Sequence, residues 1–201
     1  MTKIKKYDII FIGNKKGAIE MTKEQKKLQK FLDNNNIPAN KVTKRFENGK
    51  LVLLILAHCD IKGKVSFKDF PDLDFLELKN INGLTDIDLT HNSKLKKLYL
   101  NMNNLTNINL TQNPNLKSLS LGHNKLADIN LTQNHNLELL YLDDNRLTDI
   151  DLTQNYNLKF LVLEDNNFTT VDLTHNTKLS DVYIDPDVEM KITGELHRYY
   201  D

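Results

Sequence analysis

The sequence predicts an elongated α/β solenoid, in which short coils stack around one shared core. Three observations lead to this prediction: apolar residues recur every 21 residues, they alternate with polar residues inside each repeat, and asparagines recur in phase with them. One short strand cannot bury its apolar side chains alone, whereas stacked copies form a parallel sheet with a continuous core. A single repeat is therefore not expected to fold alone, whereas the stacked repeats form one domain.

Each repeat contains a short strand that ends at an asparagine. In the stretch LKKLYLNMNNL at 95–105, Leu98 and Leu100 alternate with polar residues, as in a strand with one buried face. The asparagine marks the turn after the strand, where its side chain can bond otherwise unpaired backbone groups. We expect a structural ladder at Asn103, Asn124, Asn145 and Asn166. The I-x-L alternation in the second half of each repeat predicts extended or tightly turning backbone.

The pattern LxxLxLxxNxL in this stretch resembles the leucine-rich repeat. The short repeat length and the second half LTxIDLTxNxxL are similar to bacterial repeats of the internalin type. The resemblance implies a curved right-handed coil, a parallel β-sheet on the concave face and few helices. Six full repeats start at Leu51, Leu73, Leu95, Leu116, Leu137 and Leu158, and a partial repeat starts at Leu179. Cys59 takes the asparagine position of the first repeat.

The chain is expected to divide into an N-terminal cap at 1–50, repeats at 51–185 and a C-terminal cap at 186–201. The stretch YDIIFIGN at 7–14 predicts a strand. A helix should follow in TKEQKKLQKFLDNNN, because Thr22 and Gln25 form a capping box and apolar residues share one face. At the other end, we expect three residues to plug the core: Ile192, Leu196 and Tyr199.

Side chains at the outward positions of the strands do not pack in the core, so they are available to bind a partner. Several are apolar or aromatic, and acidic residues run along one edge, which is the composition of a binding surface. Strand packing alone could explain the tyrosines. The expected partner-binding residues are Phe75, Lys97, Tyr99, Asn101, Ser118, Ser120, Leu139, Tyr141, Asp143, Phe160, Val162, Glu164, Asp181, Tyr183 and Asp185. Ser118, Ser120 and Gly122 should form a shallow dip.

These features predict a non-enzymatic protein-protein interaction module. Its partner would be a protein or peptide with basic and apolar features, and the family resemblance suggests a bacterial effector or host-interaction factor. Two alternatives remain open. The chain could be a structural protein that self-associates through its apolar stripe; its expected state in solution is a monomer or a weak homodimer. Residues 1–50, which carry 13 Lys/Arg against 5 Asp/Glu, could instead bind nucleic acid, although they show no recognisable module.

No set of residues indicates catalysis, a cofactor or a metal site. Cys59 occupies a structural column, and GNKKG and GKVS lack the full spacing of a phosphate loop. The Asp pairs of TDID lack the remaining ligands of a calcium loop. His91 and His175 share a column but lie four coils apart, roughly 19 Å at ~4.8 Å per strand, which is too far for one metal ion.

Composition sets the remaining limits. Of the 201 residues, 39% are hydrophobic and 27% are charged, which is typical of a soluble globular protein. No apolar run is long enough to span a membrane, and the apolar stretch IIFI is too short for a signal peptide. The sequence therefore predicts a cytoplasmic protein, or one that is secreted or delivered to a host by a non-classical route.

Overall fold

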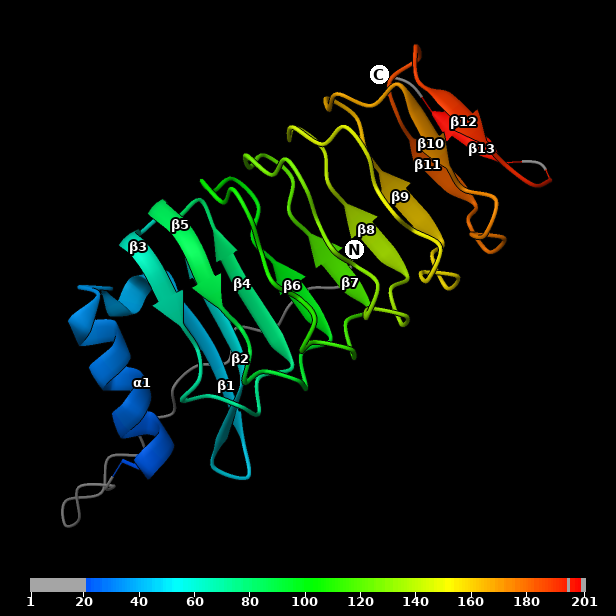
Figure 1. The fold of residues 1–201 in the computed structure, drawn as a ribbon. Coiled ribbons are helices and arrows are strands. Elements are labelled where there is room, and N and C mark those ends of the chain that lie inside the picture. Colours follow the sequence, from blue (N-terminus) through cyan, green and yellow to red (C-terminus); the bar gives the residue numbers. More distant parts are fainter. Residues whose placement is uncertain (1–20, 195, 200–201) are drawn as a thin grey trace, which may run out of the picture.

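A computed structural model describes residues 21–194 and 196–199 and confirms the predicted solenoid of stacked coils. Its coils lie one behind another from helix α1 to strands β12 and β13 (Figure 1). Most coils contribute one short strand to a long sheet, and loops return the chain along the opposite side. The expected strand at 7–14 lies outside the described residues.

The described part of the chain contains one α-helix, one 3₁₀ turn and thirteen strands. Their bounds are α1 Lys23–Asn34, η1 Ala39–Lys41, β1 Val42–Glu47, β2 Lys50–Ala57, β3 Asp60–Ser66, β4 Phe75–Lys79, β5 Asn82–Asp88, β6 Lys97–Tyr99, β7 Ser118–Ser120, β8 Leu139–Tyr141, β9 Phe160–Val162, β10 Thr170–Asp172, β11 Asp181–Tyr183, β12 Glu189–Lys191 and β13 His197–Tyr199.

Nine of these strands form the main sheet, in the order β1-β2-β4-β6-β7-β8-β9-β11-β13. All neighbours are parallel except β1 and β2, which form an antiparallel hairpin. The second half of each coil is extended or tightly turned, as the I-x-L alternation predicts. Two small parallel sheets lie there, β3 with β5 and β10 with β12.

The core is a column of leucines between the main sheet and the returning loops. Leu98, Leu119, Leu140 and Leu161 pair in register across four neighbouring strands and are fully buried. Each coil buries further apolar residues from its second half, such as Leu110 and Leu131. The coils therefore share one continuous core, as the 21-residue period requires.

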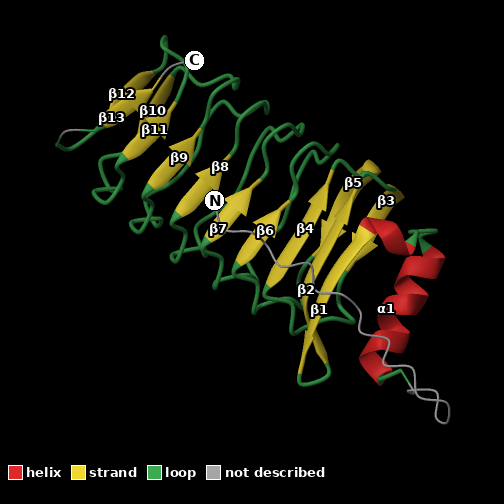
Figure 2. Ribbon diagram, turned by 180° about the vertical axis from the view of Figure 1, so that it is seen from behind, coloured by secondary structure: helices red, strands yellow, loops and turns green. Residues whose placement is uncertain are grey.

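A helix and a hairpin cover the first coil. The structure confirms the capping box: Gln25 N donates to Thr22 Oγ1 (3.2 Å), and Thr22 N donates to Gln25 Oε1 (2.9 Å). Figure 2 shows α1 at the end of the stack, next to β3. Leu28 and Leu32 are buried there, and the ring of Phe31 packs against Phe67.

Strand β1 closes the exposed edge of the main sheet. The β1–β2 hairpin turns at Asn48 and Gly49, whose φ angles of 48° and 76° match the twist that tight hairpins need. Lys44 and Arg45 on this edge strand are exposed. Charged residues on an edge strand discourage pairing with further strands. The hairpin therefore ends the sheet at this side.

The coils of β2, β4, β6, β7, β8 and β9 each turn after the strand at a residue in the left-handed region. The φ angles there lie between 47° and 58°. Asparagine, aspartate and histidine tolerate this conformation better than most residues, and they occupy most of these positions. The residues are His58, Asn80, Met102, His123, Asp144 and Asp165.

The C-terminal segment differs from the expectation that Ile192, Leu196 and Tyr199 plug the core. Ile192 is 39% exposed and Tyr199 is 41% exposed, while Leu196 only packs at the margin of the core. Strands β12 and β13 instead extend both sheets, so this segment continues the coil pattern. Val188 is buried there, and Arg198 takes the inward position beside Val182.

Arg198 is a polar substitute for a core leucine. Its Nη2 donates to the backbone oxygens of Asp185 (2.7 Å) and Val188 (3.0 Å). These bonds satisfy carbonyl groups of the last described turn. A guanidinium group thus replaces the apolar plug that the sequence predicts.

Candidate partner-binding face

The outward side chains of the main sheet lie in the three columns that the repeat spacing predicts. The name "sheet face" is used for this surface, from β2 to β11. The register aligns Phe75, Lys97, Ser118, Leu139, Phe160 and Asp181 as the first column. It aligns Glu77, Tyr99, Ser120, Tyr141, Val162 and Tyr183 as the second. Backbone hydrogen bonds between successive coils carry the alignment on to Asn101, Gly122, Asp143 and Glu164 in the third.

Aromatic rings form a row across the sheet face. The ring centroids of Tyr141 and Phe160 are 5.3 Å apart, those of Phe160 and Tyr183 are 5.4 Å apart, and those of Tyr183 and Tyr199 are 4.8 Å apart. Tyr199 thus extends the row, which the sequence analysis did not foresee. Rings at this spacing pack against their neighbours. The row is therefore preordered, and a partner would not have to fix these side chains.

A second aromatic pair lies in the N-terminal half of the sheet face. The rings of Phe75 and Tyr99 meet edge to face, with centroids 5.3 Å apart. Burial raises the pKa of Tyr141 above its ordinary value, and negative charge on Tyr99 would raise it further. Ser118 donates from Oγ to the hydroxyl oxygen of Tyr99 (3.2 Å). Tyr99 on β6 and Tyr141 on β8 lie on opposite sides of β7.

The expected dip at β7 is shallower than the side-chain sizes suggest. Ser118 is only 4% exposed, so it cannot offer much surface to a partner. A Cβ atom on Gly122 would lie 2.5 Å from Oδ1 of Asp143. The carboxylate of the next coil therefore covers this glycine. Ser120 remains partly accessible at the centre of the face.

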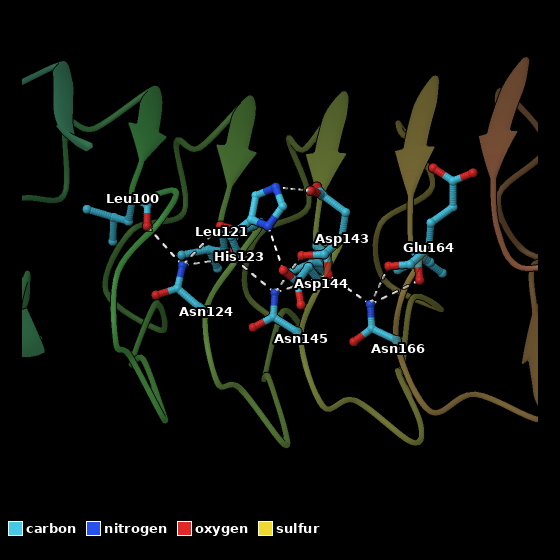
Figure 3. Close-up of polar contacts among 12 residues, drawn as sticks. Leu100, Leu121, His123, Asn124, Asp143, Asp144, Asn145, Glu164 and Asn166 are labelled. Carbon is cyan, nitrogen blue, oxygen red and sulfur yellow. Dashed lines mark hydrogen bonds and ion pairs between the residues drawn. The ribbon is translucent and has the colours of Figure 1, made fainter. Parts of the chain in front are cut away.

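The acidic edge begins at this glycine and contains a histidine that the sequence analysis did not single out. His123 Nδ1 lies 2.6 Å from Oδ2 of Asp144, and its Nε2 lies 3.6 Å from Oδ2 of Asp143 (Figure 3). Further along, Asp165 N donates to Oδ1 of Asp185 (3.1 Å). The carboxylates thus follow one another along the strand ends of successive coils.

The opposite edge, where the strands begin, carries a row of ion pairs between coils. Lys96 lies 3.4 Å from Asp74, and Glu138 lies 2.6 Å from Lys159 and 3.7 Å from Lys117. The hydrogen bond and charge of Lys159 lower the pKa of Glu138. This row was not among the expected features, although its members share one position of the repeat. We call it the start row: Asp74, Lys96, Lys117, Glu138 and Lys159.

Asn103 joins two coils through backbone groups, and Asn124, Asn145 and Asn166 do the same (Figure 3). Asn124 is typical. Its Nδ2 donates to the backbone oxygens of Leu100 and Leu121, both at 2.9 Å, and its Oδ1 accepts from Leu105 N (3.1 Å). The side chain therefore fixes the turn that presents the acidic edge.

Two further asparagine ladders support the returning loops. Asn134 is fully buried and donates to the backbone oxygens of Leu110 (3.2 Å) and Asn113 (2.9 Å), and the same contacts recur in neighbouring coils. A third ladder lies at the surface, where Asn136 Nδ2 donates to Pro114 O (3.0 Å). Its members Asn115, Asn136 and Asn157 also recur at the 21-residue spacing, which was an available signal.

The Asp pairs considered for calcium form turns instead. Asp88 Oδ1 accepts from Thr90 N (3.1 Å) and from Thr90 Oγ1 (2.7 Å). Asp151 and Asp172 make the same contacts with the threonine two residues later, and so do two asparagines at the equivalent positions. The repeated D/N-L-T pattern is the sequence signal for this turn.

These turns give a test by pH. The hydrogen bonds from Thr90 lower the pKa of Asp88 to about 2, and those from the following threonines lower the pKa of Asp151 and Asp172. A lowered pKa adds stability above the unfolded value of about 3.9, and this stability is lost as pH falls toward 2. The variant D88N/D151N/D172N lacks these titrating carboxylates. We therefore expect its urea midpoint to fall less than that of the wild type between about pH 5 and about pH 2.

The matched control uses the coils that already carry asparagine. N109D/N130D should make the acid loss steeper, since two more titrating turns are added at equivalent positions. Identical pH profiles for the wild type and both variants would contradict the account of these turns.

Other candidate chemistry does not assemble into a site. Cys59 is partly buried, and burial raises the pKa of its thiol, which disfavours the reactive thiolate. It lines an open cavity of about 590 Å³ between the cap and the first coil, with His58 and Lys41. Among residues 21–194 and 196–199, no group of three His, Cys, Asp or Glu could hold a metal ion. No helix in those ranges has the length and apolar character of a membrane span.

Stacked 21-residue coils, asparagine ladders and an aromatic sheet face define a leucine-rich repeat solenoid. No protein-family model and no curated protein matches the chain. Solved structures do match. The functional domain of InlJ from Listeria monocytogenes, which includes a cysteine ladder, is 23% identical, with a TM-score of 0.51 over 65% of this chain and 36% of that one. An LRR protein from Leptospira interrogans is 27% identical, with a TM-score of 0.55 over 66% and 38%.

A third structure, the internalin InlF from Listeria monocytogenes, is 21% identical, with a TM-score of 0.53 over 65% of this chain and 43% of that one. The chain thus shares the leucine-rich repeat solenoid fold with these three bacterial proteins. It spans less than half the length of each of these three structures.

Proposed function

We propose that the protein is a non-enzymatic interaction module that holds a protein or peptide partner on its sheet face. The observation that carries this proposal is the preordered aromatic row of Tyr141, Phe160 and Tyr183 beside the acidic edge. Tyrosine and phenylalanine that are half-buried, already packed and surrounded by polar groups are typical anchors of protein interfaces. The likeness to internalin-like solenoids supports a role of this kind.

The chemistry of the face suggests the kind of partner. Apolar side chains would pack on the ring edges, and basic groups would meet Asp143, Glu164 and Asp185. Leu139, Val162 and Asp181 lie beside this row and would exclude water from it, while the candidates Lys97 and Asn101 lie two strands away from β8. A host-interaction or effector role is the biological setting we propose, because the coils are internalin-like.

Affinity capture from host and self lysates tests this function. The variant Tyr141→Ala/Phe160→Ala/Glu164→Lys should stay folded and lose the proteins that the wild type captures. Its matched control is Tyr156→Ala, which removes an aromatic ring that is 49% exposed but lies off the sheet face. Capture that is lost with Tyr156→Ala, or kept with the triple variant, would remove the sheet-face assignment.

A further inference from the structure

The aromatic residues of the sheet face are arranged symmetrically about strand β7. Phe75 lies two strands before β7 and Phe160 lies two strands after it, both in the first column. Tyr99 and Tyr141 lie one strand away on either side, both in the second column. Each phenylalanine packs on its neighbouring tyrosine with centroids 5.3 Å apart. A twofold axis along β7 would therefore exchange like aromatic residues.

The same axis relates opposite charges. Lys79 and Glu164 occupy the third column two strands before and two strands after β7. In the start row, Lys96 and Glu138 are one strand away from β7, and Asp74 and Lys159 are two strands away. The operation thus exchanges three pairs of residues, each with one basic and one acidic member. The surface is complementary to itself at these charged positions, while Lys97 and Glu77 would face Leu139 and Val162.

From this we infer that the partner of the sheet face is a second copy of this chain, bound about a twofold axis parallel to β7. The inference rests on the proposed function, because it uses the same face. In this arrangement the two solenoids run in opposite directions. Phe75 and Tyr99 of one copy face Phe160 and Tyr141 of the other, while Lys79 faces Glu164.

The centre and the size of the face agree with a close but weak contact. Ser118 and Ser120 lie at the axis, where small side chains allow the two sheets to approach. Lys117 meets its equivalent there, and Glu138, 3.7 Å from it in the same chain, offsets the like charges. Five strands span only ~19 Å, so the buried area stays below the ~800 Å² per partner of stable complexes. The dimer should therefore depend on concentration.

Charge reversal tests the inference in the full chain. By sedimentation equilibrium, the wild type should shift from its 23.3 kDa monomer toward twice that mass as concentration rises. Lys79→Glu or Glu164→Lys alone should weaken the dimer about tenfold or more, because each places two like-charged pairs across the interface. The control variants Lys68→Glu and Glu189→Lys make the same charge changes at exposed positions off the face and should dimerise like the wild type.

The rescue is the decisive arm. The double variant Lys79→Glu/Glu164→Lys should regain the wild-type dimer, since its charges are exchanged on both copies. An equimolar mixture of the two single variants should form a heterodimer. A wild type that is still monomeric at about 1 mM, or a double variant as weak as the single ones, would overturn the inference.

The outcome separates this inference from the proposed function. A monomeric wild type whose captured partner depends on Tyr141 and Phe160 would remove the dimer and leave the interaction module intact. Dimerisation that responds to the Lys79 and Glu164 variants as described would support the inference. If the captured proteins were also unchanged by substitution of Tyr141 and Phe160, the proposal of a separate partner on this face would be removed.

Discussion

Replacing Asn124 by leucine is expected to lower the free energy of unfolding by about 1–3 kcal/mol. The buried Leu105 N would lose the acceptor that the amide supplies, whereas Leu100 O and Leu121 O would keep Asn103 and Asn145 as donors. Each buried group left without a partner costs about 1–3 kcal/mol before the structure relaxes. Urea unfolding measures the loss.

The control is the same substitution at Asn101, an outward position on the sheet face. Asn101→Leu should change stability by no more than about 0.5 kcal/mol, as is usual for surface positions. Equal midpoints for the two variants would mean that the asparagine ladder does not hold the coils together.

The second large effect is expected at the core. Leu140→Ala should cost about 2–5 kcal/mol, because Leu140 is fully buried between leucines of the neighbouring strands and its truncation leaves a cavity. Leu139→Ala, one residue earlier on the same strand, should cost under about 1 kcal/mol, since this side chain points outward and is only half-buried. Thermal or urea unfolding of the pair measures the difference.

This pair tests the register directly. A slip of one residue would exchange the two faces of the strand. If Leu139→Ala proved the more damaging variant, the columns assigned to the core and to the sheet face would have to be interchanged.

Much of the fold could be predicted because each coil repeats the same local chemistry. The 21-residue columns place Leu98, Leu119 and Leu140 in the core and Tyr99 and Tyr141 outside it, and the observed register agrees. The capping box at Thr22 and Gln25 likewise defines the start of α1 by local hydrogen bonds. Such features need only neighbours in sequence or a strict period.

What the sequence could not supply depends on contacts between specific coils. The carboxylate of Asp143 covers Gly122, and Glu138 pairs with Lys159, only because one coil sits on the next in a fixed register. At the C-terminal end the period breaks, so Arg198 and Tyr199 could not be assigned to an inward or outward side by spacing. The symmetry about β7 also becomes evident only when the strands are placed in order.

The central claim is that the sheet face binds a protein. The most direct test measures the affinity of a captured partner, or of a second copy, for the wild type and for Tyr141→Ala/Phe160→Ala by titration calorimetry or sedimentation. Two central aromatic anchors at about 2 kcal/mol each predict an affinity loss approaching a thousandfold, with an unchanged unfolding midpoint. Equal affinities for the two proteins would contradict the claim.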